Sequence, residues 1–147
     1  MTESTYPIVR ERTTVGRLWW ASLSAFLIAI AGNFMVRMFT ISVASIPAEF
    51  APFQIPRIAV FTLVGVVGAT LIFAALVRFT RQPIRLFWII SVIFLLISFI
   101  PNIAMFFTNI VPGETPAGII SLMLMHVITA AAAVVVLTRS VQPHHTE

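Results

Sequence analysis

The residues of this chain that could carry chemistry are polar side chains set inside apolar segments. The stretch "SLMLMHVITAAAA" places His126 in the middle of an apolar run. An imidazole there could bind a metal or haem, transfer a proton, or form hydrogen bonds. Four further polar residues lie within comparable runs: Asn33, Arg37, Ser98 and Asn102. Because polar groups in apolar surroundings require partners, we expect these five either to bond together or to line a cavity.

Their spacing suggests where they lie in helices. Asn33 and Arg37 are four residues apart and share a helix face, as do Ser98 and Asn102. Counted at about 1.5 Å per helical residue, these four belong to the outer half of a membrane, with His126 near its middle. Pro101 removes one backbone hydrogen bond beside Ser98, which makes the helix locally polar.

Two interpretations of this cluster are open. In the first, which we favour, the polar side chains bond to one another and form a core that holds the helices together. In the second, they line an outward-facing cavity, in which Arg37 would favour an anionic or carbonyl-bearing ligand. Glu49, in a proline-rich connection, would then be the contact of a lid over that cavity. A dry, bonded core supports the first interpretation, and an open cavity supports the second.

Catalysis is not indicated by these residues. A metal site requires several converging His or carboxylate ligands, whereas the apolar segments hold one His and no acid. His144 and His145 belong to the polar C-terminal tail, and haem would need a second strong axial ligand. The chain has no Cys and no Ser-His-acid set within these segments. We therefore expect no enzymatic activity, no metal site and no cofactor.

The elements that must position these residues follow from composition. Hydrophobic residues make up 59% of the chain, charged residues 10%, and the mean hydropathy is +1.03, which indicates a membrane protein. Four apolar segments, at about 18–39, 58–77, 86–107 and 117–137, are each long enough to span a bilayer. The first is too long for the apolar region of a cleaved signal peptide. None shows the alternation of barrel strands.

The predicted fold class is therefore all-α. We expect a multi-pass, up-down bundle of four transmembrane helices, forming a single domain over residues 1–147, with polar tails at 1–17 and 139–147. The arginines favour one orientation because cytoplasmic flanks retain positive charge. They cluster on the side that carries both tails: Arg10, Arg12, Arg17, Arg78, Arg81, Arg85 and Arg139. Both termini are thus expected in the cytoplasm of a bacterium, with the bundle in its plasma membrane.

Two connections on the opposite side differ in character. "TISVASIPAEFAPFQIP" is long and apolar, and its prolines prevent an uninterrupted helix. We expect it to lie over the bundle as a plug, or alternatively as the lid mentioned above. In "TNIVPGETPAG", Thr115 is a suitable N-cap for the fourth helix and Pro116 a suitable first residue.

Several stretches together resemble a known family. "AGNFMVR", "RQPIRLFWIISVIFLLISFIP" and "PGETPAGIISLMLMHVITAA" are similar to an uncharacterised bacterial family of small four-helix integral membrane proteins. The most recognisable elements are the Leu-Met-His at 124–126 together with Ser98 and Pro101. The resemblance implies the fold, and brings no activity or ligand.

The functional expectation is accordingly coarse. We expect a non-enzymatic bundle that acts as a scaffold, a partner or a regulatory subunit, associating with another membrane protein or with itself. The alternative is a small transporter or ligand-binding membrane protein with an outward-facing polar cavity. The lipid bilayer is the expected surrounding in both cases. Nucleic acid is not an expected partner, because the basic residues flank apolar segments and form no continuous stripe.

Overall fold

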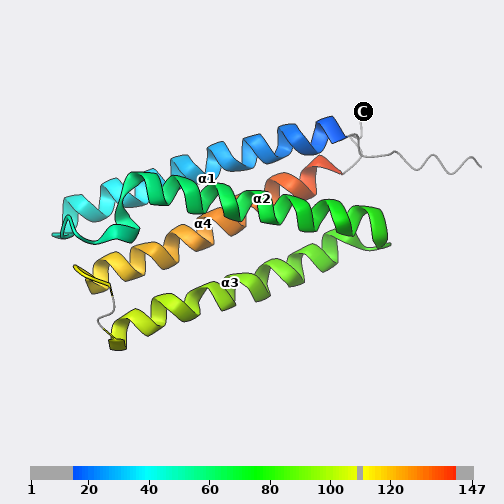
Figure 1. Cartoon of the computed structure of the whole chain (residues 1–147). Coiled ribbons are helices and arrows are strands. Elements are labelled where there is room, and N and C mark those ends of the chain that lie inside the picture. Colours follow the sequence, from blue (N-terminus) through cyan, green and yellow to red (C-terminus); the bar gives the residue numbers. More distant parts are fainter. Residues whose placement is uncertain (1–14, 109–110, 142–147) are drawn as a thin grey trace, which may run out of the picture.

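The computed structural model describes residues 15–108 and 111–141, and within them the chain is helical with no strand. The long helices are α1 (Val15–Val43), α2 (Ile55–Phe79), α3 (Pro83–Thr108) and α4 (Pro116–Ser140), with a short 3-10 turn, η1 (Ala51–Phe53), before α2 (Figure 1). All four long helices are long and apolar enough to cross a membrane. The predicted four-helix membrane fold is confirmed.

Each helix extends one to four residues beyond the predicted apolar segment at either end. The reason is physical: hydropathy marks the part of a helix that suits hydrocarbon, while the backbone stays helical through the flanking polar and aromatic residues. Pro56 lies in the first turn of α2, where its missing N–H is not needed. At α4, Pro116 begins the helix and Thr115 Oγ1 accepts a hydrogen bond from Gly118 N at 3.1 Å, which confirms the predicted cap.

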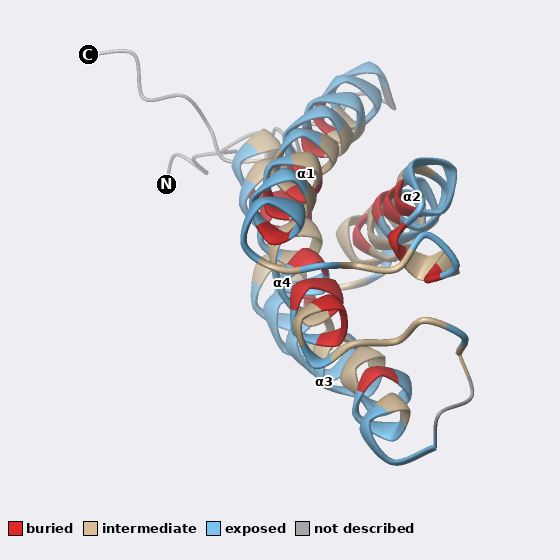
Figure 2. Ribbon diagram, turned by 90° about the vertical axis from the view of Figure 1, so that its left-hand side faces the viewer, coloured by how far each residue is buried: buried red, intermediate tan, exposed pale blue. Residues whose placement is uncertain are grey.

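Successive helices run in opposite directions, so the start of α1, the α2–α3 connection and the end of α4 lie at one end of the molecule (Figure 1). We call this the terminal end. The opposite end holds the connections 44–54 and 111–115, and we call it the capped end. Helix α4 packs against each of the other three and lies between α1 and α3, with α2 to one side (Figure 2).

The closest helix pair is α1 with α4. Ala25 and Ala29 of α1 are fully buried, in a cluster with Val66 of α2 and Ala132 of α4. At Gly32 an added Cβ would lie 2.7 Å from Ile128 Cγ2, so the α1 backbone approaches α4 directly. Small residues allow this approach where no water drives helices together.

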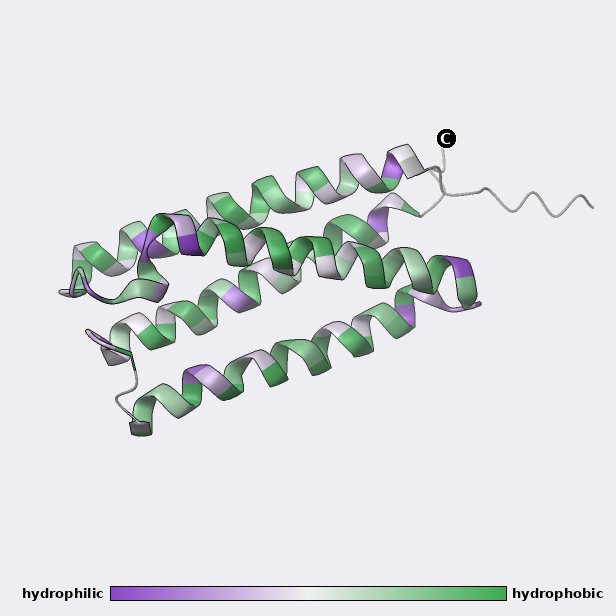
Figure 3. Cartoon of the chain, viewed as in Figure 1, coloured by the Kyte–Doolittle hydropathy of each residue, from purple (hydrophilic) through white to green (hydrophobic). Residues whose placement is uncertain are grey.

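The four helices are mostly hydrophobic along their length (Figure 3). Large side chains are exposed along α1, α2 and α3, for example Phe61 at 70% and Phe107 at 81%. On membrane-spanning helices these side chains face lipid. Trp19, Trp20 and Trp88 are exposed near the terminal end, where aromatic rings suit the membrane–water boundary.

Two connections interlock at the capped end. Phe50 and Phe53 are buried, and their rings stack with centroids 6.1 Å apart. Gly113 has a φ of +73°, and a Cβ there would lie 2.8 Å from Glu49 Cγ. A Cβ at Gly118 would lie 2.7 Å from the Phe50 ring. Gly113 in one connection and Gly118 in α4 therefore leave the room in which the 44–54 connection packs. This apolar connection covers the bundle end as a plug.

Candidate functional site

A crevice of about 600 Å³ lies between α2, α3 and α4. Figure 2 shows these helices nearly end-on, with α2 at the right, α3 below it and α4 to the left of α2. Its wall is mostly apolar, and its polar lining is confined to a few side chains. Those polar side chains are Asn33, Thr62, Ser91, Ser98, Asn102, His126 and Thr129.

The crevice opens between α2 and α3. Phe61 and Val64 of α2 and Phe94 of α3 line it, yet they are 70%, 62% and 59% exposed, so they form its rim. Toward the terminal end the two helices meet at Phe73 and Phe87, both buried, whose ring centroids lie 4.8 Å apart. The opening therefore faces the lipid side of the bundle, not either end of it.

Asn33 lies at the back of the crevice and joins three helices. It is 2% exposed, and its Nδ2 donates to Thr62 Oγ1 at 2.9 Å and to Thr129 Oγ1 at 3.0 Å. These bonds connect α1 to α2 and to α4. Its Oδ1 is buried and has no hydrogen-bond partner within residues 15–108 and 111–141. The nitrogen of this amide therefore joins the helices, whereas its oxygen is buried beside the crevice without a partner.

His126 projects from α4 into the crevice and is exposed there. Its Nδ1 lies 2.7 Å from the carbonyl oxygen of Leu122, one turn earlier. Within the described part of the chain, the hydrogen bonds of Asn33, Ser98 and Asn102 do not involve His126. The imidazole is thus positioned by its own helix, and its Nε2 is left for another partner.

Ser98 and Asn102 face the crevice from α3. Ser98 Oγ donates to Leu95 O at 2.7 Å, and Asn102 Nδ2 donates to Ser98 O at 3.2 Å. Both bonds stay within α3. The side chain of Asn102 is buried, at 5% exposure, beside the turn that Pro101 interrupts. These two residues therefore present polar atoms to the crevice without connecting α3 to another helix.

Arg37 and Glu49 do not line the crevice. Arg37 Nε donates to the backbone oxygen of Phe53 at 3.2 Å, so the guanidinium holds η1 in place. Glu49 is exposed at the capped end, next to Gly113. Of the six residues proposed from the sequence, the structure brings Asn33, Ser98, Asn102 and His126 to one crevice and separates Arg37 and Glu49 from it.

Hydroxyl groups outside the predicted set of site residues complete the arrangement. Thr62 and Thr129 hold Asn33, while Thr40 Oγ1 and Ser121 Oγ lie 2.6 Å apart between α1 and α4. Ser22 Oγ and Thr70 Oγ1 lie 2.7 Å apart between α1 and α2. The available signal was a hydroxyl on a helix face rich in small residues, but such a pattern does not identify the partner.

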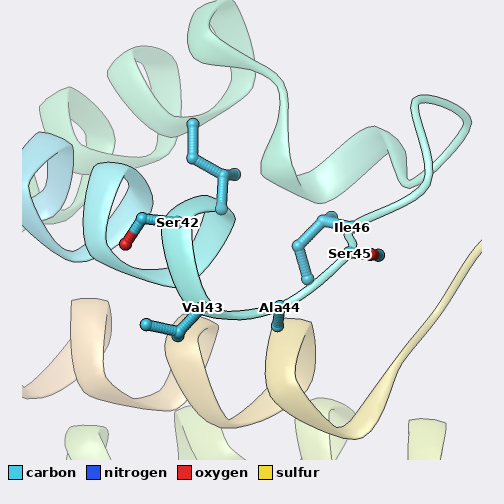
Figure 4. Close-up of a pocket in the computed structure, with 6 residues that line it drawn as sticks. Ser42, Val43, Ala44, Ser45 and Ile46 are labelled. Atoms are coloured by element: carbon cyan, nitrogen blue, oxygen red, sulfur yellow. The ribbon is translucent and has the colours of Figure 1, made fainter.

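Other features carry less chemistry. No group of three His, Cys, Asp or Glu that could hold a metal occurs among residues 15–108 and 111–141. A hollow of about 400 Å³ at the capped end is lined by one continuous stretch, Ile41–Ile46 (Figure 4). That stretch has no charged or titratable side chain, so the crevice is the stronger candidate site.

Comparison with known proteins gives a family and no function. No curated protein and no solved structure matches the chain. A family model, described as a family of unknown function (DUF6069), matches residues 9–143. This confirms the resemblance based on the Leu-Met-His of α4 and on Ser98 with Pro101. Because the match covers nearly the whole chain, the protein belongs to this family.

Proposed function

We propose that the protein is a non-enzymatic membrane protein that binds a small, mainly apolar molecule in the crevice between α2, α3 and α4. The observation that carries this proposal is the crevice itself. Its volume of about 600 Å³ falls in the range of about 300–1,000 Å³ typical of small-molecule sites. Apolar walls with a few converging polar atoms are also typical of such sites.

Binding fits this lining better than catalysis does. His126 is the one titratable side chain among the residues that line the crevice. General acid–base or nucleophilic mechanisms pair such a group with a second base, an acid or an activated nucleophile. The neighbouring groups here are amides and hydroxyls. They can orient a bound molecule, and this is the role we assign to them.

A scaffold or partner-subunit role is the second candidate. The observation in its favour is the exposure of α3. Only 6% of an apolar 18-residue stretch of α3 is buried within the protein, compared with 39% of the corresponding stretch of α4. Self-association through the alanine row of α1 has less support, because Ala21, Ala25 and Ala29 are buried inside the chain. A partner helix would therefore contact α3, or enter the crevice beside it.

The test is whether the purified protein retains a bound molecule. Native mass spectrometry in mild detergent should show wild-type protein with an added small mass. Gly68 lines the crevice and has open space at its Cβ, so Gly68→Leu should fill the crevice without a clash and abolish that mass. Gly16 also has open space but lies outside the crevice, so Gly16→Leu should retain it. Equal retention by Gly68→Leu would contradict the proposed site, and a co-purifying protein in place of the small mass would favour the second candidate.

For orientation, we propose that both termini face the cytoplasm and that the membrane is a bacterial plasma membrane. Exposed arginines at the terminal end support this: Arg17, Arg78, Arg81, Arg85 and Arg139. Pro112 is exposed at the capped end. A membrane-impermeant maleimide should label Pro112→Cys in intact cells, and labelling only after permeabilisation would reverse the assignment.

A further inference from the structure

The hydrogen-bonding polarity of the crevice restricts what can bind there, and Asn33 illustrates why. Thr62 Oγ1 donates to Ile58 O at 2.7 Å, and Thr129 Oγ1 donates to Met125 O at 2.9 Å. With their protons engaged in their own helices, both hydroxyls can only accept from Asn33. The amide nitrogen must therefore face them. The Oδ1 atom, a hydrogen-bond acceptor, is left over and buried.

His126 has the same polarity. The carbonyl oxygen of Leu122, 2.7 Å from Nδ1, can only accept a hydrogen bond. In the tautomer that this contact selects, the proton is on Nδ1 and Nε2 carries a lone pair. Since the side chain lines the crevice and is exposed in it, the imidazole offers that lone pair as an acceptor.

Helix α3 adds two further acceptors. The proton of Ser98 Oγ is engaged by Leu95 O, so the hydroxyl oxygen accepts. Asn102 uses one N–H on Ser98 O, which leaves its Oδ1 and one N–H. The crevice thus presents acceptor atoms on Ser98, Asn102 and His126, while Asn33 Oδ1 is buried behind them. The donors in the lining are one N–H of Asn102 and the hydroxyl of Ser91. Ser98 Oγ and His126 Nε2 can only accept, so a molecule that bonds to these two groups must donate a hydrogen bond.

Charge narrows the class of molecule. The residues that line the crevice include no acid, so a bound cation would be desolvated without a counter-charge, at high cost. An anion would be repelled by the acceptor atoms. The guanidinium of Arg37 cannot balance its charge, because it is bonded to the backbone oxygen of Phe53 outside the crevice. An uncharged hydroxyl donates a hydrogen bond without either penalty.

Depth and access indicate where the molecule comes from. His126 lies ten residues into α4 from Pro116, or about 15 Å below the capped end at about 1.5 Å per residue. Buried Phe50 and Phe53 cover that end. The exposed rim formed by Phe61, Val64 and Phe94 instead faces hydrocarbon. The bound molecule therefore enters laterally from the bilayer, through the opening between α2 and α3.

We infer that the crevice binds an uncharged, lipid-soluble alcohol, whose hydroxyl donates to the acceptors around His126 and whose apolar body lies along α2 and α3. This inference rests on the proposed function and names the ligand class for the same site. A hydrogen bond in such a site contributes on the order of a tenfold change in affinity. The alcohol should therefore bind about tenfold more tightly than an equivalent molecule without the hydroxyl proton.

Three probes of one apolar body test this inference: farnesol, its methyl ether and farnesylamine. The ether retains an oxygen but cannot donate, and the amine donates but is cationic. Binding to the full-length protein in nanodiscs would be measured by native mass spectrometry and by the rise in melting temperature. Farnesol should bind most tightly. His126→Phe should bring its affinity close to that of the ether, while Thr108→Val, at an exposed hydroxyl outside the crevice, should change nothing. Ser98→Ala is a second variant with the same expected direction, should His126→Phe fold poorly.

The outcomes separate the ligand class from the site. Equal affinities for farnesol and its methyl ether, both lost in Gly68→Leu, would overturn the inference of a donor and leave crevice binding intact. Tightest binding of farnesylamine would overturn the uncharged class. Binding that Gly68→Leu leaves unchanged, or no binding of any probe, would overturn this inference and the proposed site together.

Discussion

Helices α1, α2 and α4 form a cross-linked unit, whereas α3 is attached to that unit by apolar contacts. Hydrogen bonds between side chains of different helices join Asn33 to Thr62 and Thr129, and Thr40 to Ser121. The bonds formed by Ser98 and Asn102 stay within α3. Polar residues within the helices thus have two uses. Asn33 and the hydroxyls of the unit fix helices, whereas Ser98 and Asn102 on α3, together with His126 on α4, face the crevice.

The largest effect should come from the contact that attaches α3 to α2. Phe87→Ala removes a fully packed ring from its pair with Phe73 and should lower the free energy of unfolding by about 3 kcal/mol. Thermal unfolding in detergent would measure it. Phe107→Ala removes an equally large ring that is 81% exposed on the same helix, and its stability should match wild type within about 0.5 kcal/mol. Similar losses in the two variants would show that α3 is not attached at this point.

A smaller loss of stability should follow from placing a larger side chain in the contact between α1 and α4. Ala29 has no exposed surface, so Ala29→Leu should cost about 1–3 kcal/mol by forcing the helices apart. The matched change Ala104→Leu, at an exposed position on α3, should be nearly neutral in the same unfolding assay. If Ala104→Leu were the more damaging, the contrast between the unit and α3 would be reversed.

The smallest effect should come from the amide that joins three helices. Asn33→Leu removes two interhelical hydrogen bonds and should cost about 1 kcal/mol, as such bonds in membranes contribute about 0.6–2 kcal/mol. Asn102→Leu removes a bond within one helix and should cost less. A double-mutant cycle of Asn33→Leu with Thr129→Val should show coupling, whereas Asn102→Leu with Thr129→Val should show none.

The sequence was sufficient for the four helices because hydropathy over about twenty residues reports directly on what hydrocarbon tolerates. It also identified Asn33, Ser98, Asn102 and His126, since isolated polar residues are conspicuous in apolar runs. Their arrangement was not predictable in the same way. Helix periodicity places a residue on a face, but whether that face meets another helix or an opening depends on how the helices pack.

Arg37 shows the same limit. Its position four residues after Asn33 suggested a shared site, yet its long side chain reaches the backbone oxygen of Phe53. That acceptor is a main-chain atom in a connection of irregular backbone. Neither the residue types nor their spacing in the sequence predicts that Arg37 would bond to it. The interlocking of Gly113 and Gly118 with Glu49 and Phe50 was hidden for the same reason.

Helix α3 is held by contacts near both of its ends, so neither end is free to move away from the bundle. One support is the Phe73–Phe87 pair, and the other is the 111–115 connection that packs on Glu49 and Phe50. Rotation of the whole helix about one end would break the contacts at the other end. The middle of α3 can bend outward instead, and Pro101, where a backbone hydrogen bond is missing, is a point of lower stiffness at an exposed position outside the crevice lining. Such bending would widen the crevice, and it would reverse without any contact at the two ends of α3 having to form again.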